Sequence, residues 1–241
     1  MATLIFDIET VGEEWSALDE TTKHVLTRWV ERTSRTEDER ERLTVDIRDG
    51  LGFSPLTGSI VALGLYDLER ERGVVYYVGE GEDEEDNETG FFYRARTETE
   101  LLRDFWEGAS HYDIFVTFNG RAFDAPFLYH RSVACGVAPT RDLLEGRYPY
   151  QQKSCRHVDL QDELTFYGAM NKRPSLHLFC RAYGIKSPKV EVSGDDVAEL
   201  FRQKKFRDIA RYNAQDVIAT KELYERWLAY RPINRESEID F

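Results

Sequence analysis

TLIFDIET (residues 3–10) is the segment from which the fold of this chain is best predicted. It begins as a short apolar run with the alternation of a buried strand, and its two acids, Asp7 and Glu9, are two residues apart. Side chains at that spacing on a strand point to the same face of a sheet. We therefore expect a first strand that presents two carboxylates side by side.

Two later stretches place further acids on predicted elements. FNGRAFDAPFL (118–128) follows a predicted strand with a polar turn and puts Asp124 near the start of a helix. YNAQDV (212–217) lies in a predicted helix, where Tyr212 and Asp216 are four residues apart and share one surface. Acids so far apart in the chain can act together if folding gathers them into one site.

Four carboxylates in one cleft would repel one another strongly unless divalent cations neutralise their charge. Oxygen ligands are what Mg²⁺ and Mn²⁺ prefer. Two such ions, about 4 Å apart, can hold the attacking and leaving oxygens of an in-line phosphoryl displacement. We therefore predict a site for two Mg²⁺ or Mn²⁺ ions, with these ligands: Asp7, Glu9, Asp124 and Asp216.

The remaining pattern predicts an α/β fold, with a mixed sheet flanked by helices in a single domain over 1–241. Strands come first and later alternate with helices. Residues 13–57 are expected to form a helical insert after the first strand, and the acidic segment 80–88 a solvated loop. Further strands are predicted at 59–68, 73–79, 91–96 and 112–120, and helices at 97–110, 122–136, 174–185, 195–203 and 206–231. Residues 157–164 are expected to form a short strand that runs into a helix. The strands at 59–68, 73–79 and 91–96 are expected to form hairpins.

Composition limits the compartment and the cofactors. No apolar run approaches the roughly 18–20 residues needed to cross a bilayer, and MATLIFDIET lacks the basic region of a secretory signal, so we expect a cytoplasmic protein with no membrane partner. The three cysteines, Cys135, Cys155 and Cys180, form no CxxC pair. A zinc site or a disulfide framework is therefore not expected.

The net charge of −13 argues against a broad basic face for nucleic acid, although an acidic metal site itself lowers the isoelectric point. The segment 80–88 alone holds seven acids. Two local basic clusters could still line a groove, and each could equally be ordinary surface charge. Their members are Arg141, Arg147, Lys153 and Arg156 in the first cluster, and Lys172, Arg173, Lys186 and Lys189 in the second.

The three acidic stretches together resemble a known family. FDIET, N-x-x-x-F-D and Y-x-x-x-D are similar to the three motifs of the DEDD 3′–5′ exonucleases, which have a ribonuclease H-like fold. A tyrosine four residues before the last aspartate marks the DEDDy branch; the DEDDh branch would need histidine at the position of Arg211. FNGRAFDAPFL, HVDLQDEL and ARYNAQDV resemble most closely the stand-alone exonucleases related to the proofreading domain of family B DNA polymerases. The segments 13–57 and 80–88 lie outside this resemblance.

The resemblance implies a role for each site residue. Asp7, Glu9 and Asp216 would hold the catalytic metal, Asp7 would bridge to a second ion, and Asp124 would reach that ion through water. Tyr212 would orient the attacking water. Contacts to the terminal nucleotide are expected from three further residues: Thr10, Asn119 and Phe123.

The predicted function is therefore metal-dependent 3′–5′ exonuclease activity on single-stranded ends, which releases nucleoside 5′-monophosphates. DNA is favoured over RNA. RNA trimming by the same site and non-catalytic binding of 3′ ends are the alternatives. A role in DNA repair or proofreading would require a protein partner, such as a polymerase or a repair complex.

Several other polar residues are better explained without chemistry. We expect His157 and His177 to be structural histidines and Asp159 to have a structural hydrogen-bonding role. Lys186 or Lys189 could contact a phosphate. Each acidic motif taken alone also has a structural explanation, since Asp124 could cap a helix and Tyr212 could be a packing residue.

Overall fold

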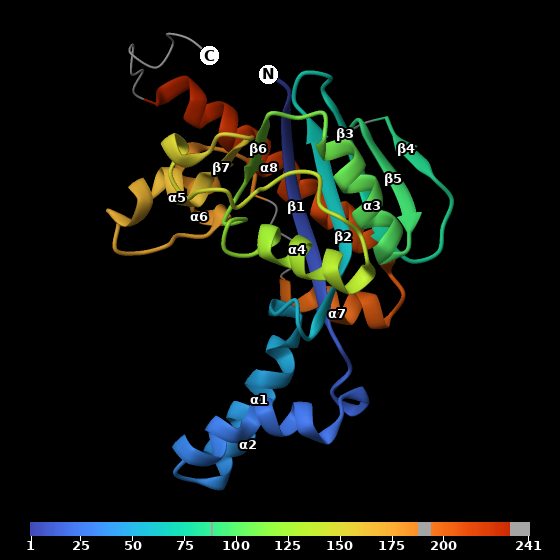
Figure 1. Ribbon diagram of the computed structural model, residues 1–241, viewed down its shortest axis with the longest axis vertical. Coiled ribbons are helices and arrows are strands. Elements are labelled where there is room, and N and C mark those ends of the chain that lie inside the picture. Colours follow the sequence, from blue (N-terminus) through green and yellow to red (C-terminus); the bar gives the residue numbers. More distant parts are fainter. Residues whose placement is uncertain (88, 188–193, 232–241) are drawn as a thin grey trace.

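The computed structural model describes residues 1–87, 89–187 and 194–231 (Figure 1). These residues form one mixed sheet of seven strands. The strands are β1 (Thr3–Gly12), β2 (Gly58–Asp67), β3 (Arg72–Val78), β4 (Glu84–Asp86), β5 (Phe91–Arg96), β6 (Ile114–Thr117) and β7 (Arg156–Asp159). Their order across the sheet is β4-β5-β3-β2-β1-β6-β7. The first strand of the chain thus lies inside the sheet, as the apolar stretch TLIFDI predicts.

Helices cover both faces of the sheet. The helices of the described residues are α1 (Glu20–Thr33), α2 (Glu37–Asp49), α3 (Glu98–Ala109), α4 (Asp124–Cys135), α5 (Leu160–Leu164), α6 (Leu176–Tyr183), α7 (Gly194–Arg202) and α8 (Phe206–Tyr230), of which α1 and α2 lie away from the sheet (Figure 1). In Figure 1, α3 and α4 lie in front of the sheet and α8 crosses behind it. The predicted arrangement, a mixed sheet flanked by helices, is confirmed.

The alternation of β1 divides the core between the two faces. Leu4, Phe6 and Ile8 pack into a cluster with α3 and α4, whereas Ile5 packs on the opposite side with α8. Phe6 is fully buried and its ring lies 5.5 Å from that of Phe105. The face that Ile5 shares with α8 is also the face of Asp7 and Glu9, because the side-chain period of a strand is two.

Local signals in the sequence set several helix ends. Thr97 accepts a hydrogen bond from the backbone of Glu100, whose side chain accepts one from the Thr97 backbone in return, which forms a capping box at the start of α3. Gly184 ends α6 in the left-handed region at φ 72°, where glycine carries no steric penalty. The described residues contain no helix long and apolar enough to cross a membrane.

The acidic segment 80–88 differs from its prediction as a loop. Glu84–Asp86 form β4, which pairs antiparallel with β5 at the edge of the sheet, and residue 88 lies outside the described residues. Arginines pair with the acids, since Arg207 contacts Glu84 and Arg94 lies 3.7 Å from Asp83. An edge strand tolerates such charge because one of its sides faces solvent. The expected run of hairpins is also wrong at β5, which lies parallel to β3.

The predicted helical insert within 13–57 is confirmed, and it is anchored to β1. The helices α1 and α2 project beyond one end of the sheet (Figure 1). The chain returns through a short 3₁₀ helix, Gly50–Phe53, whose Leu51 is buried. Thr10 Oγ1 donates to the Gly52 carbonyl at 2.7 Å, and Thr57 Oγ1 donates to the Leu51 carbonyl at 2.8 Å. The base of the insert is thus fixed next to the acidic part of β1.

We expect Leu51→Ala to lower the free energy of unfolding by about 2–5 kcal/mol, because it removes a buried side chain and leaves a cavity. Leu56→Ala is the matched control, since Leu56 is 75% exposed in the same segment, and it should change the stability by less than about 0.5 kcal/mol. Urea unfolding followed by circular dichroism measures both. Equal midpoints for the two variants would show that the insert is not anchored through Leu51.

Candidate functional site

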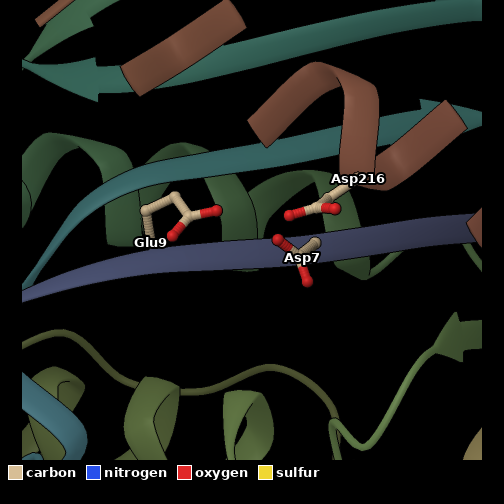
Figure 2. Close-up of side chains that lie close together, drawn as sticks. All are labelled: Asp7, Glu9 and Asp216. Atoms are coloured by element: carbon tan, nitrogen blue, oxygen red, sulfur yellow. The ribbon is translucent and has the colours of Figure 1, made fainter. Parts of the chain in front are cut away.

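Three of the four predicted acids meet between β1 and α8. Asp7 and Glu9 project from β1 toward Asp216, which α8 brings across the strand (Figure 2). One ligand oxygen from each carboxylate lies within 4.8 Å of the others, and all three side chains are half-buried. Residues more than 200 positions apart in the sequence are therefore close enough to share one cation.

The approach of α8 depends on a glycine in β2. Gly64 lies opposite Asp7 in the antiparallel pairing of β1 and β2. A Cβ atom at Gly64 would clash with Asn213 Oδ1 and would lie 2.7 Å from Val217 Cγ2. The missing side chain leaves the space in which α8 packs against the sheet at the level of Asp7.

Asn213 is a site residue that the sequence interpretation missed. Its side chain is fully buried, and Nδ2 donates to Asp7 Oδ2 at 2.9 Å and to the Asp7 carbonyl at 3.2 Å. The signal was available, because Asn213 lies three residues before Asp216 on α8, and residues three apart on a helix are neighbours. Asn213 therefore orients Asp7 from the same helix that delivers Asp216.

The electrostatics of the cluster favour a bound cation. Burial raises the pKa of Asp7 well above its ordinary value, the carboxylates of Asp124, Asp216 and Glu9 raise it further, and the hydrogen bond from Asn213 opposes this. A divalent cation would relieve the repulsion among these groups. The donor set consists of carboxylate oxygens, which are the ligands that Mg²⁺ and Mn²⁺ prefer. The residues present fit such an ion.

Asp124 lies beside this group but outside it. It is the first residue of α4, it is buried, and its Oδ1 accepts a hydrogen bond from the Ile8 backbone at 3.0 Å. The pairing of β6 with β1 ends at Ile5, so the side chain of Asp124 takes the place of a strand partner for Ile8. Burial raises the pKa of Asp124 to about 7. One of its oxygens is therefore fixed by the backbone of the strand that carries Asp7.

Tyr212 lies next to Asp216, as the four-residue spacing predicts. The phenol is buried and hydrogen-bonds to Asp216. Burial raises its pKa, and so do the negative charges of Asp216 and Glu9. The phenol therefore stays protonated at neutral pH and acts as a hydrogen-bond donor rather than as a base.

Of the three residues predicted to contact a nucleotide, Thr10 lies on β1, and Asn119 and Phe123 lie in the turn between β6 and α4. The hydroxyl of Thr10 is engaged by Gly52, and the ring of Phe123 lies 5.3 Å from that of Phe127. Asn119 adopts a positive φ of 63°, and its backbone N–H donates to Asp159 Oδ1 at 2.9 Å. Their contacts to substrate stay predictions.

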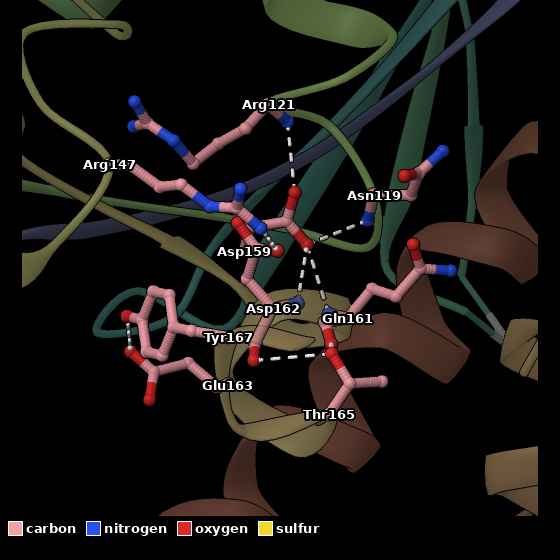
Figure 3. Close-up of polar contacts among 9 residues, drawn as sticks. All are labelled: Asn119, Arg121, Arg147, Asp159, Gln161, Asp162, Glu163, Thr165 and Tyr167. Carbon is pink, nitrogen blue, oxygen red and sulfur yellow. Dashed lines mark hydrogen bonds and ion pairs between the residues drawn. The ribbon is translucent and has the colours of Figure 1, made fainter. Parts of the chain in front are cut away.

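The polar residues predicted to be structural are held by hydrogen bonds. Asp159 accepts from the backbones of Asn119, Arg121 and Gln161 (Figure 3). His157 is buried between Thr117 Oγ1 and the Leu143 carbonyl, and burial lowers its pKa to about 4. His177 contacts the Ser187 hydroxyl at 2.6 Å. Of the two lysines predicted to contact phosphate, Lys186 is exposed and Lys189 lies outside the described residues.

Comparison with known proteins finds a family and several relatives to which this chain is similar. The family described as "Predicted 3'-5' exonuclease related to the exonuclease domain of PolB" matches residues 73–237. DNA polymerase 1 of Sulfurisphaera ohwakuensis is 22% identical over 158 residues, and DNA polymerase 1 of Saccharolobus solfataricus is 25% identical over 170 residues. These matches cover 59% and 64% of this chain but 18% and 19% of the two polymerases.

A solved structure shows the same fold. The family B DNA polymerase from the hyperthermophilic archaeon Pyrobaculum calidifontis superposes with a TM-score of 0.57 at 22% sequence identity. The likeness covers 94% of this chain and 24% of that chain. It confirms the ribonuclease H-like fold class predicted from the motifs. The family match confirms the predicted resemblance to exonucleases of this kind, whereas the DEDDy branch stays a prediction.

We expect Asn213→Ala and Gly64→Ala to weaken Mn²⁺ binding by about 10- to 100-fold, the range typical of residues that orient metal ligands. The first removes the donor to Asp7, and the second pushes that donor away. Gln215→Ala, on the exposed side of the same helix, is the control. Calorimetric titration with Mn²⁺ measures the affinities. Unchanged affinity in both variants would remove Asn213 from the site.

The contribution of Asp124 to the stability of the metal-free protein should fall as the pH rises from about 4 to 7, opposite in sign to that of His157. Folded Asp124 has a pKa of about 7, above its ordinary value of 3.8, so the folded state keeps a proton that the unfolded state releases. One such proton gives a slope of up to about 1.4 kcal/mol per pH unit. Asp124→Asn should flatten this slope, whereas Asp38→Asn, an exposed acid on α2, should not. Urea unfolding in EDTA at several pH values measures the slopes, and equal slopes in all three proteins would contradict the assignment.

Proposed function

This chain belongs to the family of predicted 3′–5′ exonucleases related to the exonuclease domain of PolB, and from that premise we propose that it removes nucleotides from single-stranded 3′ ends. The observation that carries the proposal is the meeting of Asp7, Glu9 and Asp216 within 4.8 Å. The chain spans less than a fifth of the polymerases that it matches, so the substrate and pathway belong to the proposal.

The proposed metal ligands follow from the positions of the acids. Asp7, Glu9 and Asp216 would hold one Mg²⁺ or Mn²⁺ ion, and Asp7 with Asp124 would serve a second ion, Asp124 through water. When bound, such ions lower the pKa of an attacking water and stabilise the departing 3′ oxygen. The products would be nucleoside 5′-monophosphates.

The chain's own residues would supply orientation. Tyr212, a protonated donor beside Asp216, is placed to orient the attacking water, which is the role expected in the DEDDy branch. Asn213 keeps one oxygen of Asp7 in place, and the Ile8 backbone does the same for Asp124. Thr10, Asn119 and Phe123 would contact the terminal nucleotide.

DNA is the substrate favoured by this proposal, because the two relatives that the chain resembles are DNA polymerases. RNA trimming would need contacts to the ribose 2′-hydroxyl, which distinguish RNA from DNA. A polymerase or a repair complex as protein partner stays a prediction from the sequence.

We expect the protein to shorten 5′-labelled single-stranded DNA in the presence of Mg²⁺ or Mn²⁺, and we expect this shortening to stop when EDTA removes the metal. Asp7→Asn should lower the rate by about 10³-fold or more, because it removes a ligand charge at the reacting phosphate. Tyr212→Phe should lower it on the order of 10-fold or more, because it removes one hydrogen-bond donor. Gel electrophoresis of the labelled products, with RNA of the same sequence in a parallel lane, gives the rates and the preference.

Asp208→Asn, an exposed acid on the first turn of α8, is the matched control and should keep the wild-type rate. Activity that survives both EDTA and Asp7→Asn would assign the cleavage to something other than this site. Tight binding of a 3′ end without any shortening would favour the non-catalytic alternative.

A further inference from the structure

A small cavity of about 230 Å³ lies beside the turn that follows β6. Its charged lining residues come from four separate segments of the chain: Arg121, Arg147, Arg173, Asp159 and Asp162. Asn119 and Ala122 complete the wall. In a chain with a net charge of −13, three arginines around one cavity are a local exception. Arg147 and Arg173 belong to the two basic clusters noted in the sequence, one to each.

The two aspartates of the cavity are occupied by protein groups. Asp159 accepts hydrogen bonds from the backbones of Asn119 and Arg121 at 2.9 and 3.0 Å (Figure 3). Asp162 Oδ1 accepts from Arg147 Nη2 at 2.7 Å. The charge of Asp162 is thus paired with that of Arg147, and the lining keeps one more positive than negative charge.

The arginines keep donors for a further partner. A guanidinium has five N–H donors. Arg147 uses one toward Asp162, and Arg121 uses one toward the Leu143 carbonyl at 3.1 Å. Burial lowers the pKa of Arg121, which indicates a partly desolvated cation. An anion in the cavity would compensate the charge of such a group. Guanidinium groups bind phosphate oxygens in pairs of parallel hydrogen bonds.

The cavity and the acidic cluster lie at the same edge of the sheet. The parallel strands β1, β6 and β7 are adjacent, and neighbouring strands are about 4.8 Å apart. Thr117 and Asp159 are partners at the ends of β6 and β7. The turn that follows Thr117 carries Asn119 and Arg121 into the cavity wall and then reaches Asp124, beside Asp7. The strand that carries Asp7 is therefore two positions away in the sheet from the strand that carries Asp159.

We propose that Arg121, Arg147 and Arg173 form a subsite for a backbone phosphate of the substrate strand, on the 5′ side of the bond that is cut. This inference rests on the proposed function, which it extends by naming where the strand is held. Asp159 acts as a positioning residue, because it fixes the turn that carries Arg121. The subsite gives an acidic protein a local way to hold a polyanion.

The test is binding of a 3′-terminal single-stranded DNA oligomer labelled with fluorescein at its 5′ end, measured by fluorescence polarisation in EDTA. Arg121→Gln, Arg147→Gln and Arg173→Gln should each raise the Kd roughly 10-fold, since each removes a charge-assisted hydrogen bond. The slope of log Kd against log salt should fall by about 0.7 for each phosphate that a variant no longer neutralises. Arg103→Gln, exposed on α3 across the sheet, is the control and should leave both quantities unchanged.

A second arm locates the phosphate. A neutral methylphosphonate replaces one of the first four linkages from the 3′ end. When the methylphosphonate lies at the linkage that the arginines hold, the wild-type protein should bind the modified strand with a higher Kd than the unmodified strand. Arg173→Gln should then raise the Kd for this modified strand only slightly further. Coupling of this kind isolates a direct interaction. Effects that add independently at every linkage, or arginine variants that bind like wild type, would overturn the subsite.

The two proposals fail in different ways. If the arginine substitution and the methylphosphonate are coupled but the DNA is not shortened in the presence of metal, the exonuclease proposal is refuted and the phosphate subsite stands. If the DNA is shortened but no coupling is found, the subsite is refuted and the exonuclease proposal stands. Arg121→Gln also removes a bond to Leu143, so Arg173→Gln, whose side chain is exposed, tests the subsite without that risk to folding. Arg121→Lys keeps the positive charge but loses the paired N–H donors of the guanidinium, so its Kd for DNA should lie between those of wild type and Arg121→Gln.

Discussion

The contact between α8 and β1, made by Asn213 and Asp7, is the interaction on which the site depends. A buried amide binds a half-buried carboxylate at 2.9 Å, and the same helix supplies Tyr212 and Asp216. The contact requires that no side chain project from Gly64, since α8 packs directly on the sheet there. This single packing arrangement therefore fixes the spacing of the acids, the donor that orients them and the phenol beside them.

A second carboxylate organises the other side of the site. Asp159 holds the backbone of the turn after β6 by two hydrogen bonds and also caps the start of α5. That turn carries Asn119 and Arg121 and leads into Asp124, whose own carboxylate is tied to Ile8. Elements on both sides of the acidic cluster are thus fixed by side-chain-to-backbone bonds, which cost little rearrangement when a ligand binds.

Periodicity and motif spacing predicted most of this architecture. The buried first strand and the helical insert follow from local patterns, and the three acidic motifs predicted that Asp7, Glu9 and Asp216 would converge. Asn213 was missed because an amide on a helix has many ordinary uses until its neighbour across the fold is known. The sequence placed Arg147 and Arg173 in two separate basic clusters and Arg121 in neither. The cavity that joins them was missed because a distant carboxylate, Asp159, positions the turn that carries Arg121. The short strand at Glu84–Asp86 was missed because its acidic residues predict a solvent-exposed loop. The arginines that pair with this acidic segment come from elsewhere in the chain.

The negative charge of β4, at one edge of the sheet, affects whether the sheets of two molecules can pair. The last strand of a sheet offers unpaired backbone groups to which a strand from a second molecule could add. In this protein the outermost position is held by three acids, of which Glu84 and Glu85 are exposed. A second copy approaching edge to edge would meet its own negative charge. The same electrostatic repulsion that makes this segment look unstructured in the sequence thus protects the sheet from open-ended growth and aggregation.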